Sequence, residues 1–257
     1  MKRSIYRNIF FISLTFAFTL TFAISFAQEN TSGKVVYEEV MKLEIKLEGD
    51  AAQFAHMLPK ERKSNKVLYF NQESSLYENK AKEEDETMSM SSGHANVMIK
   101  MAEPENKVFT DLESKKRIEQ REFMTRTFLI ADIAEQKWKM TGKQKMILDF
   151  PCQEATIEKD SIIYSAWFTP AIPVSAGPAN YGGLPGLILA IESSDGKRST
   201  TATSVEFAEV GKDLLSKPKK GKKVTRDEFD QIVQEKMKEM GAEHGGEGRS
   251  MMIRIHR

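Results

Sequence analysis

Apolar and polar residues alternate along Val35–Leu47, which is the clearest pattern in the 257-residue chain. Its second half places apolar side chains at every other position: Met41, Leu43, Ile45 and Leu47. Lysine and glutamate occupy the positions between them. Because successive side chains of a β-strand point to opposite faces, the pattern predicts an antiparallel strand with one buried and one solvated face.

Short β-type segments separated by turn residues fill most of the chain after this strand. The predicted strands are Lys66–Phe70, Ser74–Glu78, Val97–Met101, Lys107–Leu112, Arg117–Met124, Thr127–Ile130, Trp138–Thr141, Lys145–Leu148, Pro151–Glu158, Ser161–Phe168, Leu187–Glu192 and Arg198–Val210. Asn71–Glu73, Lys159-Asp160 and Ser194–Gly196 are turn signals that predict hairpins. We therefore expect residues 28–210 to form a mainly β domain, an antiparallel curved sheet or an incomplete barrel.

Two places interrupt the regular succession of strands. Asn79–Asn96 is polar and acidic and has no apolar period, so it predicts a long exposed loop. Gly142 separates two of the short segments above, which we expect to be distinct strands.

The C-terminal part of the chain changes from β-type to helical patterning. Residues 211–224 are rich in lysine and predict a basic linker. Thr225 followed by Glu228 matches a capping box. Apolar residues then recur at helical spacing: Phe229, Ile232, Val233, Met237 and Met240. We expect residues 225–257 to hold one amphipathic helix, Thr225–Met240, ended by Gly241 and followed by a loose tail.

The N-terminus has the layout of a secretory signal peptide over residues 1–27. Lys2, Arg3 and Arg7 precede an apolar run, and Ser25–Ala27 supplies small residues at the positions that precede cleavage. The apolar run is short for a membrane span, which needs about 20 residues. The pattern predicts an exported protein, periplasmic or secreted, with no transmembrane span after the signal is removed.

The stretch Ala166–Ile188 combines many prolines and glycines with apolar side chains. Such density predicts a rigid, irregular path, and its apolar character predicts burial. Within it, Gly183, Leu184, Pro185 and Gly186 carry the Pro-Gly order of a type II turn. We expect a structural loop that carries the chain from one strand to the next, with its leucines and Ile188 pointing inward.

The same stretch carries a family resemblance. Its motifs are GLPGLI at Gly183–Ile188 and, upstream, Trp138, Cys152–Thr156, Tyr164–Pro170, Ile172-Pro173 and Gly177-Pro178. The chain resembles the GLPGLI family of secreted bacterial proteins, although Glu154 stands where members usually carry a basic residue. The resemblance implies export but no established activity. The strand-rich layout of the family is similar to that of periplasmic lipoprotein carriers, which are half-open barrels with an apolar groove.

Charge and motifs exclude several classes of function. Without Lys2, Arg3 and Arg7 the formal net charge changes from +1 to −2, which does not favour nucleic acid as a partner. The chain has no sequence signature of a serine hydrolase, a zinc protease or a P-loop nucleotide site. We therefore expect a non-enzymatic protein of the cell envelope without a cofactor.

Cys152 is the one cysteine of the chain, so it has no internal disulfide partner. It suits a small buried residue within a strand. The alternatives are an intermolecular bridge, a metal ligand or the nucleophile of a hydrolase.

Five aromatic residues accompany the central stretch: Trp138, Tyr164, Trp167, Phe168 and Tyr181. They are the candidate site for an apolar ligand, in which case they line a cleft. They equally suit a structural role, in which they fill the concave face of the sheet. A cell-envelope protein is the alternative partner.

Methionine and histidine suggest a second function. Met88, Met90 and His94 lie together in the polar segment, and thioether and imidazole groups are ligands for Cu(I). A soft-metal site is therefore the alternative to ligand or partner binding.

Overall fold

The computed structural model describes residues 29–46, 59–80, 87–92, 95–100, 104–133, 135–243 and 252–254. The predicted signal peptide, residues 1–27, lies outside this part of the chain. Within the described residues, no helix combines the length and apolar character needed to cross a membrane.

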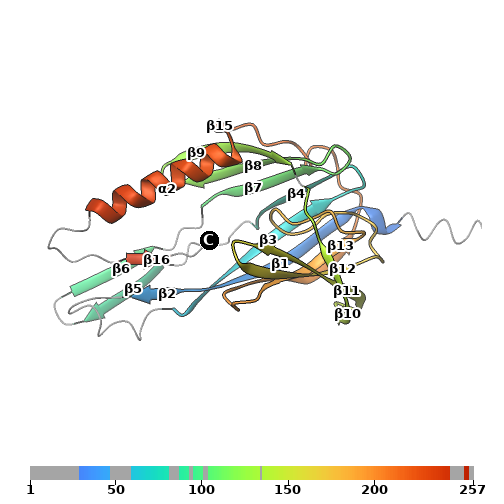
Figure 1. Ribbon diagram of the computed structural model, residues 1–257, viewed down its shortest axis with the longest axis horizontal. Coiled ribbons are helices and arrows are strands. Elements are labelled where there is room, and N and C mark those ends of the chain that lie inside the picture. Colours follow the sequence, from blue (N-terminus) through green and yellow to red (C-terminus); the bar gives the residue numbers. More distant parts are fainter. Residues whose placement is uncertain are drawn as a thin grey trace, which may run out of the picture.

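Twelve of the described strands form one sheet, which is bent (Figure 1). Their order is β10 (Lys139–Ile147), β11 (Phe150–Lys159), β12 (Ile162–Thr169), β13 (Leu187–Ser193), β14 (Arg198–Phe207), β1 (Gly33–Lys42), β3 (Glu61–Phe70), β4 (Ser74–Asn79), β7 (Asn106–Asp111), β8 (Lys116–Phe123), β9 (Arg126–Ile133) and β15 (Lys222–Thr225). Neighbouring strands are antiparallel except β15 and β9, which are parallel. The predicted mainly β fold is confirmed, and the sheet is open, with β10 and β15 at its edges.

The main core lies between one face of this sheet and the segment that joins β12 to β13. On β1, Val35 and Tyr37 are fully buried, as the alternating pattern predicts. They pack with Leu68 from β3 and with Ile172 and Val174 from the connecting segment. The connection therefore covers the sheet.

Smaller strands lie outside the large sheet. β5 (Thr87–Ser92) pairs with β6 (Ala95–Lys100), and β2 (Glu44–Lys46) pairs with β16 (Met252–Arg254). A short 3₁₀ helix, η1 (Glu29–Thr31), precedes β1. The predicted loop Asn79–Asn96 is therefore wrong over β5 and over the first two residues of β6. Strands with few apolar residues form there through a pairing that composition does not reveal.

Gly142 does not separate two strands, so that prediction is wrong as well. Strand β10 continues through it, with an irregular register between Met140 and Gln144. Gly142 has φ +81° and absorbs the irregularity within the edge strand.

Helix α2 (Arg226–Glu243) begins as its capping box predicts. The Glu228 backbone N–H donates to Thr225 Oγ1 at 3.2 Å, and the Thr225 N–H donates to Glu228 Oε2 at 2.7 Å. The helix continues past Gly241, so the predicted C-cap is wrong. Strand β15 also occupies the last part of the predicted linker, residues 211–224, because its backbone pairs with β9.

Candidate functional site

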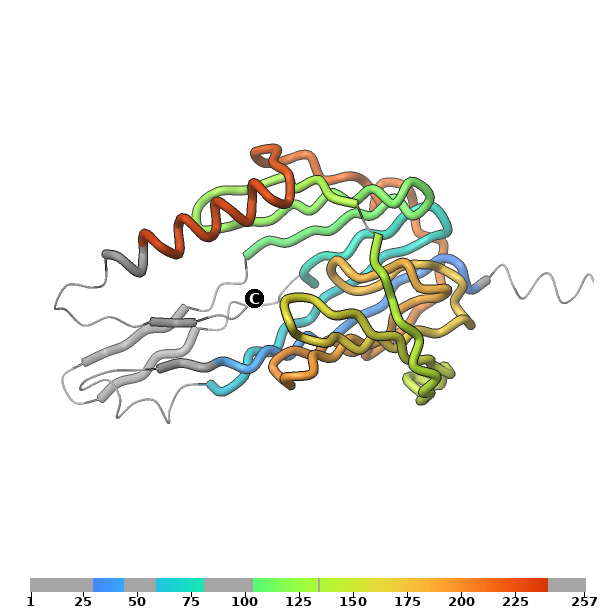
Figure 2. The backbone as a smooth tube through the Cα atoms, viewed as in Figure 1, coloured from blue at the N-terminus to red at the C-terminus, as the bar shows by residue number. Residues whose placement is uncertain are grey.

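The segment between β12 and β13, which we call the crossing loop (residues 170–186), folds back on itself through backbone hydrogen bonds (Figure 2). The Leu187 N–H donates to the Ile172 carbonyl at 3.0 Å. The Gly183 N–H donates to Ser175 at 3.1 Å, and the Ile188 N–H donates to Ala176 at 3.0 Å. These bonds give the loop a fixed shape, as the sequence predicts.

The turn within the loop differs from the predicted type II turn. The Gly186 N–H donates to the Leu184 carbonyl at 2.8 Å, which is a three-residue turn centred on Pro185. A type II turn would have the Leu187 N–H donate to the Leu184 carbonyl, but this N–H donates to the Ile172 carbonyl instead. The predicted inward anchoring is confirmed, because Leu184, Leu187 and Ile188 are all buried.

The structure gathers four of the five candidate aromatic residues. Tyr164 and Phe168 pack in one buried cluster, with Trp138 and Tyr181 against it. The Tyr181 ring centroid lies 5.8 Å from that of Tyr164 and 6.2 Å from that of Trp138. Trp167 instead packs in the main core on the other side of β12. These contacts match the structural alternative, in which the aromatic side chains fill space.

A network of charged side chains, not predicted from the sequence, ties the crossing loop to the far strands. Arg117 on β8 is buried and donates to the Asn180 carbonyl at 2.5 Å and to Asp132 Oδ2 at 2.9 Å. Arg226, the first residue of α2, approaches the same carboxylate at 3.7 Å and pairs with the buried Glu119 at 2.5 Å. Ion pairs therefore join the sheet to the helix, and the Arg117 hydrogen bond to the Asn180 carbonyl joins the crossing loop to the same network.

Asp132 connects the two arginines of this network. Burial alone raises its pKa. The hydrogen bond and the charge of Arg117, the hydrogen bond from the Ile133 backbone N–H and the smaller effect of Arg226 together outweigh burial and hold the pKa below its ordinary value. A carboxylate with a lowered pKa stabilises the fold above its unfolded pKa, and that contribution is lost as the pH falls through the folded pKa.

We expect Asp132→Asn to lower the free energy of unfolding by about 2 kcal/mol at pH 7, because it weakens a hydrogen bond between charged groups. The difference from the unsubstituted protein should shrink as the pH falls below 3.8, the ordinary pKa of an aspartate. Urea unfolding at pH 7 and at pH 3 or lower measures both effects. Asp213→Asn, at an exposed position, is the control, and a loss that does not change with pH would refute the assignment.

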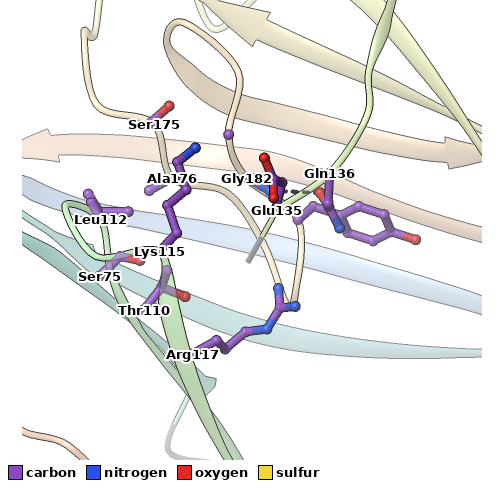
Figure 3. Close-up of a pocket in the computed structure, with 12 residues that line it drawn as sticks. Ser75, Thr110, Leu112, Lys115, Arg117, Glu135, Gln136, Ser175, Ala176 and Gly182 are labelled. Atoms are coloured by element: carbon purple, nitrogen blue, oxygen red, sulfur yellow. Dashed lines mark hydrogen bonds between the residues drawn. The ribbon is translucent and has the colours of Figure 1, made fainter. Parts of the chain in front are cut away.

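A cavity of about 170 Å³ lies where the crossing loop approaches the β7–β8 turn (Figure 3). Ser75 and Thr110 line it from the sheet, and Ser175 and Gly182 line it from the loop. The Gln136 side chain holds the loop beside the cavity, since it donates to the Asn180 carbonyl at 3.0 Å and accepts from the Gly182 N–H at 3.3 Å. Of the five candidate aromatic residues, only Tyr181 lines this cavity.

Two oppositely charged side chains face the cavity without a bond to each other. Lys115 extends from the β7–β8 turn toward the crossing loop, and Glu135 comes from the segment after β9 (Figure 3). In the part of the chain that the structure describes, neither has an ion-pair partner. Both charges remain available to a bound molecule.

The opposite face of the sheet has a wider and shallower groove of about 700 Å³, with Val36, Tyr69 and Thr203 among its lining residues. Much of its charge is already paired. Lys34 lies 3.0 Å from Glu206, and Lys107 lies 3.1 Å from Glu78. The cavity at the crossing loop is therefore the stronger candidate site.

Cys152 is buried in the main core, which agrees with the sequence prediction of a small buried residue. Burial raises the pKa of its thiol to about 11, despite the nearby charge of Lys145. Since the thiolate is the reactive form, this environment suppresses nucleophilic chemistry.

We expect Cys152 in the folded protein to react with a thiol reagent at pH 8 at least about 100-fold more slowly than a free cysteine, from its raised pKa and its burial. Absorbance of the released chromophore gives the rate. Addition of 6 M guanidinium should restore rapid reaction, and Cys152→Ser gives the blank. Rapid reaction of the folded protein would show that the thiol is accessible.

The predicted soft-metal residues fall outside the described side chains. Met88 and Met90 belong to strand β5, of which only the backbone is described, and His94 lies outside the described residues. Among the described residues, no three His, Cys, Asp or Glu side chains are grouped to hold a metal ion. Copper binding stays a prediction.

Residues 156–190 match a family model described as "Protein of unknown function (Porph_ging)". This match includes the last four residues of β11, all of β12, the crossing loop and the first four residues of β13. No curated protein matches the sequence.

The fold is similar to that of PNGF-II, solved in two space groups, with TM-scores of 0.53 and sequence identities of 15% and 16%. The alignments cover 79% of this chain and 33% of PNGF-II, so the chain spans about a third of the length of those structures. At this identity the similarity concerns the fold alone. An uncharacterized conserved protein from Thermus thermophilus aligns with a TM-score of 0.37 and 8% identity, over 81% of this chain and 99% of that one.

Proposed function

We propose that the protein is an exported, non-enzymatic binding protein of the bacterial cell envelope that holds a small polar ligand in the cavity beside the crossing loop. The observation that carries the proposal is the pair of unmatched charges, Lys115 and Glu135, in a cavity whose wall is a hydrogen-bonded loop. Preformed concave sites with a few fixed polar groups are typical of ligand pockets. The signal-like N-terminus supports export.

The same proposal includes membership of the GLPGLI family of secreted proteins. Its support is the string Gly183–Ile188, which lies within the matched residues 156–190. The structure adds a physical reason for the string, because its leucines anchor the loop and its second glycine lies against the backbone of Thr169.

A polar ligand has better support than the apolar ligand suggested by the aromatic residues. Tyr164, Trp167 and Phe168 are buried in packed clusters, and Trp138 packs against one of them and donates to the Gly182 carbonyl at 2.8 Å. The first three surfaces are therefore already covered, and Trp138 is half-buried. Hydroxyl, ammonium and carboxylate groups surround the cavity instead.

Mass spectrometry under non-denaturing conditions, on protein purified from the envelope of its own host, tests the proposal. We expect a mature chain that begins at Gln28 and carries a bound small molecule. Thr110→Trp fills the cavity from β7 and should abolish the bound mass, whereas Thr201→Trp, at an exposed position of β14, should retain it.

Three results would count against parts of the proposal. Retention of residues 1–27 in a cytosolic protein would reject export. A bound mass that persists in Thr110→Trp would reject the cavity as the site. Chemical crosslinking to a protein, with no small molecule bound, would favour a protein partner.

A further inference from the structure

The free charges of the cavity have opposite signs. Arg117 also lines the cavity, but its charge is matched by Asp132 at 2.9 Å. That leaves Lys115 on the β7–β8 turn and Glu135 on the segment after β9, both at exposed positions (Figure 3). A ligand with a single charge would satisfy one of them and meet the like charge of the other.

The size of the cavity limits the ligand. Its volume of about 170 Å³ is small beside the pockets of roughly 300–1,000 Å³ that hold drug-sized molecules. Hydroxyls from Ser75 and Thr110 offer further hydrogen bonds, and Leu112 and the Tyr181 ring offer apolar contact to a short side chain. The occupant is therefore compact, polar at two ends and slightly apolar between them.

We propose that the ligand is a compact zwitterion of the α-amino acid class, whose carboxylate meets Lys115 and whose ammonium meets Glu135. The inference rests on the proposed function, since it names the ligand of the same cavity. Charge-assisted hydrogen bonds at both ends give the site selectivity for molecules that carry both groups.

Isothermal titration calorimetry with the twenty free L-amino acids tests this inference. For any amino acid that binds, two analogues isolate the charges: one lacks the ammonium and the other lacks the carboxylate. For L-leucine these are 4-methylpentanoate and 3-methylbutylamine. We expect at least one amino acid to bind at least about tenfold more tightly than both of its analogues.

Two variants remove the charges of the site separately. Lys115→Met and Glu135→Gln should each weaken binding by at least about tenfold. Lys212→Met and Glu209→Gln, at exposed positions outside the cavity lining, are the matched controls and should bind as the unsubstituted protein does. All four substitutions lie at exposed positions, and thermal melting confirms that each variant is folded.

The inference is overturned if no amino acid binds, if an analogue with one charge binds equally well, or if either cavity variant binds normally. Whether Thr110→Trp keeps the co-purified molecule shows if only the ligand class is wrong or if the proposed function fails too. If that variant still loses the co-purified molecule while no amino acid binds, the cavity is the site and only the ligand class is wrong. If that variant keeps the molecule, the proposed function fails as well.

Discussion

Gly186→Val is expected to lower the free energy of unfolding by about 3–5 kcal/mol. Gly186 has φ +152°, a backbone conformation that residues with a side chain rarely adopt. A Cβ atom at this position would lie 2.2 Å from the Thr169 carbonyl oxygen and 2.6 Å from its carbon. Because both are backbone atoms of β12, the strand end or the loop has to move.

Gly142→Val is the control that distinguishes the steric clash expected at Gly186 from the strain of a positive φ. Gly142 also has positive φ, +81°, but a Cβ atom there would meet nothing within 4 Å. We expect a loss of only about 1–2 kcal/mol in this control. Urea unfolding of both variants gives the comparison. Equal losses would mean that close packing of the loop on β12 contributes nothing, and unchanged stability with lost binding would make the loop a recognition element.

Phe229→Ala is the second substitution with a large expected effect. The Phe229 side chain is fully buried, with its ring centroid 5.3 Å from that of Phe128 and 6.1 Å from that of Phe123. It attaches helix α2 to β9, so its removal should lower the free energy of unfolding by about 3–5 kcal/mol.

Hydrogen exchange of the α2 amides identifies the source of this loss. We expect faster exchange in Phe229→Ala along the helix, because the helix is no longer held to the sheet. Met237→Ala, on the same helix but 48% exposed, should change stability by no more than about 0.5 kcal/mol. A similar effect of both substitutions would show that helix formation, and not docking, accounts for the loss.

Features that depend on neighbouring residues could be predicted from the sequence. The hairpin at Ser194–Gly196 follows from its turn residues, and the start of α2 follows from Thr225 and Glu228. The burial of Val35 and Tyr37 follows from alternation on β1. In each case the relevant side chains lie within a few positions of one another.

Features that depend on distant pairing could not be predicted in this way. Strand β1 pairs with β14, so that Gly33 lies opposite Phe207, and β15 pairs with β9 although composition indicates a linker. The turn at Pro185 takes its form from a bond between Leu187 and Ile172. No local pattern contains such information.

The candidate site shows the same division. The sequence suggests the aromatic residues near the crossing loop as a ligand site, but in the structure most of them pack in the core. In the sequence, Arg117 has no feature that distinguishes it from other charged residues on strands. The alternation of side chains along a strand is compatible with its pointing inward, but does not predict it. Lys115 and Glu135 become candidates only when folding brings the β7–β8 turn and the segment after β9 to one cavity.

The most direct test of binding at the crossing loop is a crystal structure of the protein isolated with its ligand from its own envelope. We expect density for a small molecule in the cavity, in contact with Lys115 and Glu135, with the loop in the conformation described above. An empty cavity, with the bound molecule instead in the groove beside Tyr69 or against the aromatic cluster, would contradict this assignment.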